Sequence, residues 1–259
     1  MISQAEFDDK AALPVGKLLC LAALGGLGIS VSVALAYSWT AKLFSYPVKN
    51  LKELYIASFW VLAAGLLYPV VKNLGINPAA SLRSLNVNKG RTLKLALKYF
   101  FLYLAILLSV LAVLFAVVIL SDKTGASAQH TAFFFSNKGM DKDISYLNSV
   151  ILLSPYRTFW YFISVCLLAP IVEEVFYRRL LFVGLRKKIP FAPSLIISSL
   201  IFGSMHSSLA LATILGLYLG YVYEKEKNIF VNIALHSSIN LLTSGIMMLL
   251  WHAKTILGA

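Results

Sequence analysis

Long apolar runs separated by short polar segments dominate the pattern of this sequence. The runs lie at about 15–39, 54–71, 95–120, 159–185, 193–209, 211–223 and 229–251. A helix needs about 20 apolar residues to cross the hydrocarbon core of a bilayer. The two runs between 193 and 223 are shorter, so we expect these helices to be tilted, broken or buried in the bundle. The pattern predicts an all-α fold, a polytopic membrane protein built as a bundle of about seven to eight transmembrane helices.

The composition supports an integral membrane protein with one domain over residues 1–259. Hydrophobic residues make up 59% of the chain and charged residues only 13%, and the mean hydropathy is +0.79. The net charge of +12 comes from basic residues in the short segments between apolar runs. That distribution indicates contact with membrane lipid and not with nucleic acid, because no soluble domain carries an aromatic-interleaved basic stripe.

The distribution of Lys and Arg also predicts the orientation. Most of the basic residues fall in 72–98, in 178–188 and at Lys225 and Lys227. With seven spans and a cytoplasmic N-terminus, these segments all lie on the cytoplasmic side, as the positive-inside rule requires. We therefore expect an integral protein of a bacterial cell membrane with its N-terminus in the cytoplasm.

The apolar run at 159–185 contains two adjacent carboxylates and an arginine. A charge near the centre of a membrane helix costs about 2.5–3.5 kcal/mol on insertion scales, so such groups usually serve a function. Glu174 and Arg178 are spaced i and i+4 on a helix and can form an ion pair. Glu173 points about 100° away around the helix, so it can stay outside that pair.

Two further runs contain polar groups. His206 lies one helical turn beyond Phe202 in the run at 193–209, and His236 and Asn240 are spaced i and i+4 in the last run. A single membrane histidine is more often a hydrogen bond between helices than a catalyst. Polar groups on three separate spans, however, are expected to meet in the bundle interior, where they avoid lipid.

The depths of these groups do not match along straight helices. Glu173 lies about thirteen residues, roughly 20 Å, from the inner end of its run, whereas His236 lies only about seven residues, roughly 10 Å, into the last run. The last helix must begin lower than its apolar pattern indicates, or the helices must tilt enough to bring the two residues to one level.

The three motifs together resemble one known family. Glu-Glu-x-x-x-Arg at 173–178, Phe-x-x-x-His at 202–206 and His-x-x-x-Asn at 236–240 occur in the order found in the CPBP family of CAAX prenyl proteases and bacteriocin-processing membrane proteins, also called Abi proteins. The resemblance covers about 159–250 and includes the Gly-Leu-Tyr-Leu-Gly-Tyr stretch at 216–221. Arg179 is a departure, because family members often have glycine after the motif arginine.

The resemblance implies an intramembrane endopeptidase whose catalytic helices lie in 157–251. It would hydrolyse a peptide bond in a membrane-associated or lipidated peptide. The resemblance makes Glu173 the general base that deprotonates a water held with His206. It makes His236 and Asn240 the hydrogen-bond donors to the oxyanion.

The supporting residues are implied in the same way. Glu174 and Arg178 would fix the helix and the electrostatic setting, with Phe202 beside them.

Another mechanism and another function are also compatible with these residues. Glu173, His206 and His236 could instead hold zinc, although the sequence lacks the more specific His-Glu-x-x-His signal, and we expect no cofactor. The protein could also be a non-catalytic membrane scaffold or a bacteriocin-immunity protein that retains the polar cluster as structural hydrogen bonds. A proton-coupled transporter is less favoured, because the two halves of the sequence show no matching pair of broken spans.

Overall fold

All regular structure in the described part of the chain is helical. The computed structural model describes residues 14–44, 52–74, 78–123 and 154–257. The elements are α2 (Val15–Phe44), α3 (Lys52–Asn73), α4 (Pro78–Lys123), α7 (Pro155–Ile163), η2 (Ser164–Leu168), α8 (Ala169–Glu174), η3 (Val175–Phe182), α9 (Val183–Arg186), α10 (Phe191–Ser204), α11 (Leu209–Glu226) and α12 (Ile229–Leu257).

The helices confirm the prediction of an all-α polytopic membrane protein. Within the described ranges, five helices are long and apolar enough to cross a membrane: Val15–Thr40, Lys52–Asn73, Asn88–Val117, Pro155–Arg186 and Ile229–Leu249. The two short runs form α10, with 14 residues, and α11, with 18 residues. At 1.5 Å per residue, α10 spans roughly 21 Å, which is less than the hydrocarbon core.

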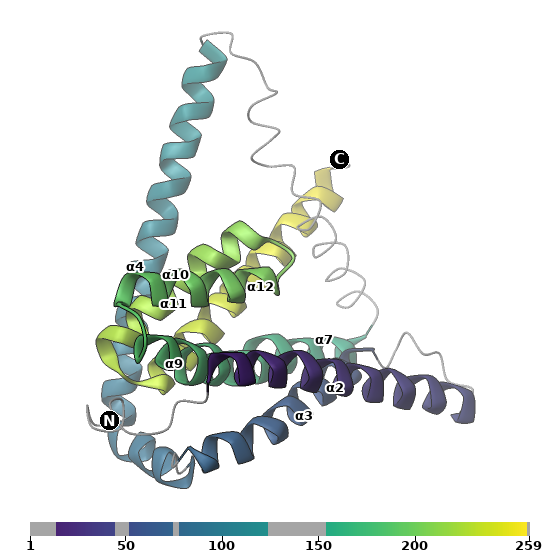
Figure 1. Cartoon of the computed structure of the whole chain (residues 1–259). Coiled ribbons are helices and arrows are strands. Elements are labelled where there is room, and N and C mark those ends of the chain that lie inside the picture. Colours follow the sequence, from purple (N-terminus) through teal and green to yellow (C-terminus); the bar gives the residue numbers. More distant parts are fainter. Residues whose placement is uncertain (1–13, 45–51, 75–77, 124–153, 258–259) are drawn as a thin grey trace.

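The elements α7, η2, α8, η3 and α9 form one continuous helical rod (Figure 1). Two of its segments, η2 and η3, have the wider π-helical hydrogen-bond pattern, and the amide of Ala169 donates to the carbonyl of Ser164 five residues earlier. Pro170 lacks an amide hydrogen and its ring would crowd the carbonyl four residues before it, which favours local widening. Single-turn π segments are frequent at functional sites, and here they flank the glutamate pair.

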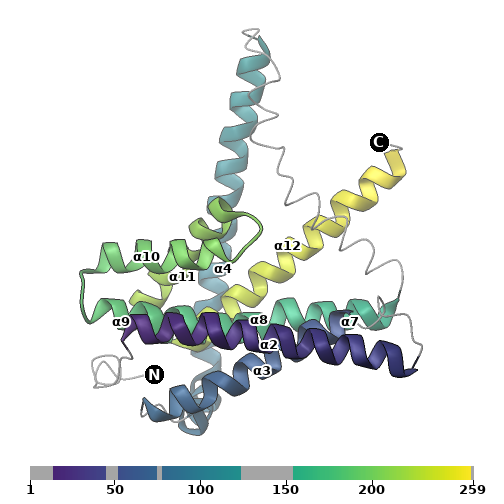
Figure 2. The same ribbon diagram turned by 45° about the vertical axis from the view of Figure 1, so that its right-hand side comes forward.

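Helices α2 and α3 pack along this rod, and α12 crosses it obliquely in both ribbon views (Figures 1 and 2). One buried apolar cluster joins Leu18 of α2, Val71 of α3, Leu181 of η3 and Phe202 of α10. A second cluster joins α4 to α11 and α12. The charged residues of the rod are therefore enclosed by apolar side chains from several helices.

Close backbone approach fixes the α10–α11 hairpin. A Cβ atom at Gly203 would lie 2.8 Å from the carbonyl oxygen of Leu209, and one at Gly216 would lie 3.1 Å from Cα of Ser199. Small residues allow membrane helices to pack at such short distances. The hairpin therefore holds Phe202 firmly against the rod.

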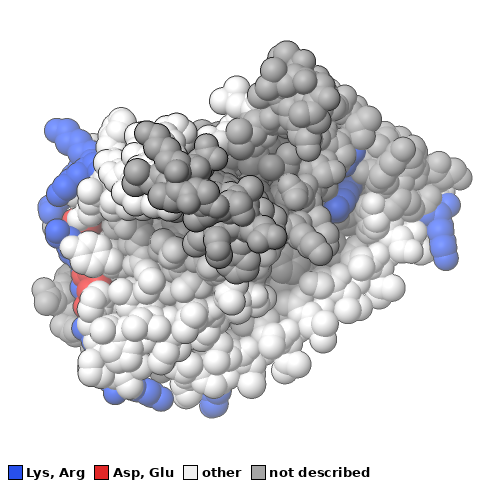
Figure 3. All heavy atoms as spheres, turned by 90° about the horizontal axis from the view of Figure 1, so that it is seen from above, with Lys and Arg blue, Asp and Glu red and all other residues white. Residues whose placement is uncertain are grey.

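Several basic residues lie at one end of the bundle. Lys17 lies in the first turn of α2, Lys72 in the last turn of α3 and Arg186 ends α9, and apolar packing joins these three helix ends. Figure 3 shows Lys and Arg in separate groups on several sides of the molecule, with white, uncharged surface across its lower part. This arrangement is the one that the positive-inside rule associates with the cytoplasmic side, and the orientation itself stays a prediction.

Candidate active site

Glu174 and Arg178 form the ion pair predicted from their spacing. Nε of Arg178 donates to Oε2 of Glu174 at 3.1 Å, and both side chains are fully buried. The guanidinium also lies over the ring of Phe202, with 5.2 Å between its central carbon and the ring centroid. A cation placed over an aromatic face in this way is stabilised electrostatically.

Two residues of α12 complete the surroundings of Glu174. Nδ2 of Asn232 donates to Oε2 at 3.1 Å, and Nδ1 of His236 lies 2.9 Å from Oε1. Both oxygens of the carboxylate are thus occupied, as a buried charge requires. The sequence motifs do not include Asn232, although it precedes His236 by one helical turn.

His236 joins the two glutamates. An ionised carboxylate only accepts hydrogen bonds, so Nδ1 carries the proton in its bond to Glu174. The other ring nitrogen, Nε2, lies 3.7 Å from Oε2 of Glu173. The ring therefore has one nitrogen committed to Glu174 and the other facing Glu173.

The depth mismatch between Glu173 and His236 is resolved by tilt. Helix α12 begins at Ile229, where the apolar run begins, so it does not start lower than the sequence indicates. Its oblique path across the rod brings His236 beside Glu173 (Figure 2).

Glu173 lies on the wall of an apolar cavity of about 530 Å³. Its side chain is 14% exposed, whereas that of Glu174 is fully buried. Helices α2 and α3 supply most of the wall, including Gly26, Trp60 and Leu67. The polar lining consists mainly of Glu173, His206 and Ser207. The cavity therefore combines an apolar interior with one localised group of reactive side chains.

His206 lines the same cavity, but its position in the chain differs from the prediction. Helix α10 ends at Ser204, so His206 lies in the turn that follows and not within a span. Its ring packs on Phe202 with 4.4 Å between centroids, and Nδ1 donates to the Phe202 carbonyl at 2.8 Å. That bond leaves Nε2 of the neutral ring as an acceptor.

Asn240 faces the rod one helical turn beyond His236. Its Nδ2 donates to the carbonyl of Val165 in η2 at 2.8 Å. One amide hydrogen is therefore bonded to backbone, and a second hydrogen remains on the same nitrogen. Asn240 is not among the side chains that line the cavity with Glu173 and His206.

Phe202 lies at the centre of the site and packs against the aromatic rings around it. Its ring is fully buried and contacts Tyr177 at 5.1 Å and His236 at 5.9 Å between ring centroids, in addition to His206. The ring lies between the Arg178 guanidinium and the His206 ring, so it holds these two groups apart.

The glutamates and histidines of the site are also the candidate metal ligands. Among the residues that the structure describes, no group of three or more His, Cys, Asp or Glu side chains is arranged to hold a metal ion. Nδ1 of His236 binds Glu174 and Nδ1 of His206 donates to a backbone carbonyl, which is the pattern that metal-ligating histidines also show, so the choice between the two mechanisms stays a prediction.

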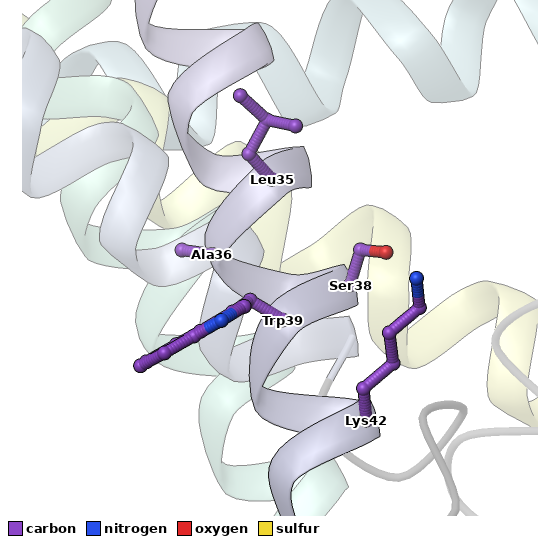
Figure 4. A pocket seen from close by; sticks show the side chains of 5 residues that line it. All are labelled: Leu35, Ala36, Ser38, Trp39 and Lys42. Carbon is purple, nitrogen blue, oxygen red and sulfur yellow. The ribbon is translucent and has the colours of Figure 1, made fainter.

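A second hollow near the end of α2 has no comparable chemistry. Its lining residues all come from α2, and Figure 4 shows their side chains along that one helix: Leu35, Ala36, Ser38, Trp39 and Lys42. Because no other element contributes a polar group, we assign it no function.

Comparison with known proteins finds a similar family for one segment of the chain. The fold and the site define an integral membrane protein whose ionisable groups gather at one cavity inside a helical bundle. Residues 155–242 match the model of "Type II CAAX prenyl endopeptidase Rce1-like" proteins. This segment, about a third of the chain, contains the three motifs that resemble the CPBP family, so the match supports that resemblance.

One curated relative is similar over a comparable stretch. It is a protein of Bacillus subtilis (strain 168) named "Putative membrane peptidase YdiL", 35% identical over 77 residues. The aligned part is 29% of this chain and 32% of the relative, so the chain spans about a third of that protein's length. No solved structure matches the chain significantly.

Proposed function

We propose that the protein is an intramembrane endopeptidase that uses a glutamate-activated water. The observation that carries this proposal is the shared cavity of Glu173 and His206, with His236 held by Glu174 at 3.7 Å from Glu173. The match of residues 155–242 to a family model of endopeptidases supports a peptidase, and the name of the Bacillus relative points the same way.

In the proposed reaction, a water lies between Glu173 and Nε2 of His206. Glu173 takes one proton as the water oxygen attacks the peptide carbonyl, and the C–O bond forms while the carbonyl π electrons move to oxygen. Collapse of this intermediate breaks the C–N bond, and the proton held by Glu173 passes to the leaving amine. General-base catalysis of this kind contributes about 10²- to 10⁴-fold.

The oxyanion would be stabilised by groups on α12. Because Nδ1 of His236 is committed to Glu174, Nε2 carries a proton only when the ring is doubly protonated. His236 therefore donates to the oxyanion as an imidazolium, paired with the buried carboxylate behind it. The second amide hydrogen of Asn240 is the other candidate donor. Each such donor is worth about 2.7–4 kcal/mol in other enzymes.

The cavity suggests the kind of substrate. Most of its lining is apolar and comes from membrane helices, which favours a membrane-associated or lipidated peptide with membrane lipid around it. We place the protein in a bacterial cell membrane with its N-terminus in the cytoplasm, and treat residues 1–259 as one domain.

The test is cleavage of candidate peptides by the purified protein in detergent. Wild type should cleave, and Glu173→Gln should lose about 10²- to 10⁴-fold in rate while remaining folded. Activity should survive exhaustive chelation and should fall on acidification as the base is protonated. Restoration by zinc after chelation, with one metal per chain, would replace this mechanism with a metal-dependent one.

A non-catalytic scaffold or bacteriocin-immunity protein is the second candidate. The observation in its favour is that the hydrogen bonds around Glu174 would also serve to hold helices together. In that case Glu173→Gln and His206→Ala would both still support the cellular role, and no peptide would be cleaved.

A further inference from the structure

Asn232 is a buried polar residue that the proposed reaction does not use directly. It lies on α12 one turn before His236, and its side chain has no solvent exposure. Its Nδ2 donates both to Oε2 of Glu174 at 3.1 Å and to the carbonyl of Leu219 at 2.8 Å. These two bonds satisfy both hydrogens of the buried amide nitrogen, whereas Oδ1 has no hydrogen-bond partner among the described residues. Asn232 therefore ties α11 and α12 to the carboxylate.

Arg178 by itself does not fix the orientation of Glu174. It binds the carboxylate through Nε only. Within the described part of the chain, its Nη1 and Nη2 have no hydrogen-bond partner. An arginine that bound with two parallel bonds would determine the plane of the carboxylate, whereas a single bond to Oε2 lets the group rotate. The bond from Asn232 to the same oxygen restricts this rotation and leaves Oε1 for His236.

The orientation of Glu174 in turn decides the state of His236. Oε1 of Glu174 accepts from Nδ1 of His236 at 2.9 Å, which holds the proton on Nδ1 and directs Nε2 towards Glu173. A partner on one ring nitrogen sets the tautomer and the orientation of a histidine. If the carboxylate rotates, the neutral ring can take the other tautomer or flip.

We propose that Asn232 is a positioning residue that keeps Glu174 oriented and thereby holds His236 with its proton on Nδ1 and Nε2 facing Glu173. The effect on the ring follows from contacts in the structure alone. The effect on cleavage rests on the proposed function.

The first test measures the ring directly. The protein is labelled with ¹⁵N-histidine and its four histidines are observed by solid-state NMR in lipid bilayers, with His236 assigned by its absence in His236→Ala. At a pH where the His236 ring is neutral, wild type should show a single state with the proton on Nδ1. Asn232→Leu, which has a similar shape and no donor, should show mixed tautomers or a changed state at His236.

A matched control separates positioning from general destabilisation. Asn228 lies just before α12 and donates to Thr92 on α4, with Nδ2 3.3 Å from Oγ1, far from Glu174 in the hydrogen-bond network. Asn228→Ala removes an asparagine contact of the same helix and should leave the His236 signals unchanged. If Asn232→Leu does not fold, Asn232→Ser, which is smaller and keeps a hydroxyl donor, is measured in its place.

The second test measures cleavage. Asn232→Leu should lower kcat about 10- to 100-fold, the usual range for a residue that orients a reacting histidine from behind, with a change in KM below about threefold. Unchanged His236 signals in the folded variant, or an equal change in Asn228→Ala, would overturn the proposal. Loss of the His236 state in a protein whose wild type cleaves nothing would support the positioning role and reject the proposed function.

Discussion

The described part of the chain contains two buried pairs of a glutamate with an arginine, and they are built differently. Glu53 and Arg157 are 104 residues apart and join α3 to α7 through two bonds, Nε to Oε2 at 2.8 Å and Nη2 to Oε1 at 2.7 Å. Glu174 and Arg178 are four residues apart on one rod and share a single bond at 3.1 Å.

The difference lies in what the second carboxylate oxygen does. In the pair between α3 and α7, the arginine binds both oxygens, which is the geometry best suited to joining two helices. In the pair on the rod, the arginine binds one oxygen and the other holds His236. The first pair is therefore expected to matter for stability alone, and the second for stability and for the state of the site.

The largest effect is expected from Glu174→Gln. Removal of this carboxylate leaves Arg178 buried without its counter-ion, which costs about 3–5 kcal/mol of unfolding free energy, and it should also lower cleavage because His236 loses its acceptor. Thermal unfolding and peptide cleavage in detergent measure the two effects. Glu173→Gln is the matched control, with cleavage lost and stability largely kept. Equal loss of stability in the two variants would refute this division of roles.

Arg157→Met should lose a similar free energy of unfolding, about 3–5 kcal/mol, because the buried Glu53 loses the arginine that binds both of its oxygens. Cleavage per folded molecule should stay at the wild-type level. The double variant Glu53→Leu with Arg157→Met should recover most of the stability, because two apolar side chains replace the pair. A folded Arg157→Met protein that cannot cleave would show that this pair also acts on the site.

Gly203→Ala should lower the free energy of unfolding by a smaller amount, and it should disturb the surroundings of the Glu174–Arg178 pair but not those of Glu53 and Arg157. The new methyl group would lie 2.8 Å from the Leu209 carbonyl oxygen, so α10 and α11 must separate and Phe202 must move away from Arg178. Overpacking of this kind costs about 1–3 kcal/mol. Gly245→Ala, where a Cβ atom meets nothing within 4 Å, is the control in unfolding measurements. No loss of stability in Gly203→Ala would mean that the hairpin does not support the site.

The smallest effect is expected at Glu224, where Arg186 and Lys227 bind the carboxylate at 3.0 and 2.8 Å. Partial burial raises the pKa of Glu224, but the hydrogen bonds from Arg186 and Lys227 outweigh it, so the pKa lies below its usual value of 4.5. A lowered pKa stabilises the fold above pH 4.5, and this contribution is lost as the pH falls through the folded-state pKa.

The melting temperatures of wild type and Glu224→Gln, compared across pH, test this. The gap between them should be small, because partly exposed pairs contribute less than about 1 kcal/mol. It should be constant above pH 4.5 and should shrink below it. A gap that grew on acidification would contradict the assigned direction.

The sequence predicts the helices and one pair well because both depend on local spacing. Apolar runs reveal the spans directly, and the four-residue spacing of Glu174 and Arg178 survives the change from α8 to η3 between them. The pairing of Glu53 with Arg157 could not be foreseen, because nothing in the sequence relates residues 104 positions apart.

The sequence pattern does not predict the parts of the site that depend on packing between helices. The apolar run continues past Ser204, where α10 ends. The sequence pattern therefore predicts His206 inside a helix, whereas it lies in the turn that follows. Asn232 carried a usable signal, since it shares the four-residue spacing of His236 and Asn240. Its partners on α8 and α11 lie 58 and 13 residues away, and only the folded bundle reveals them.

The π-helical segment Ser164–Leu168 has a consequence for changes in chain length. A π turn holds one residue more than an α turn, so a single deletion there can convert it to an α turn while the segments on either side keep their faces. The same deletion within the α-helical segment Pro155–Ile163 has no extra residue to remove, and it would turn Arg157 and its contact with α3 by about 100° relative to the glutamates. Two deletions a few residues apart, both leaving the hydropathy pattern and all three motifs intact, should therefore differ in whether Glu173 keeps its place in the cavity.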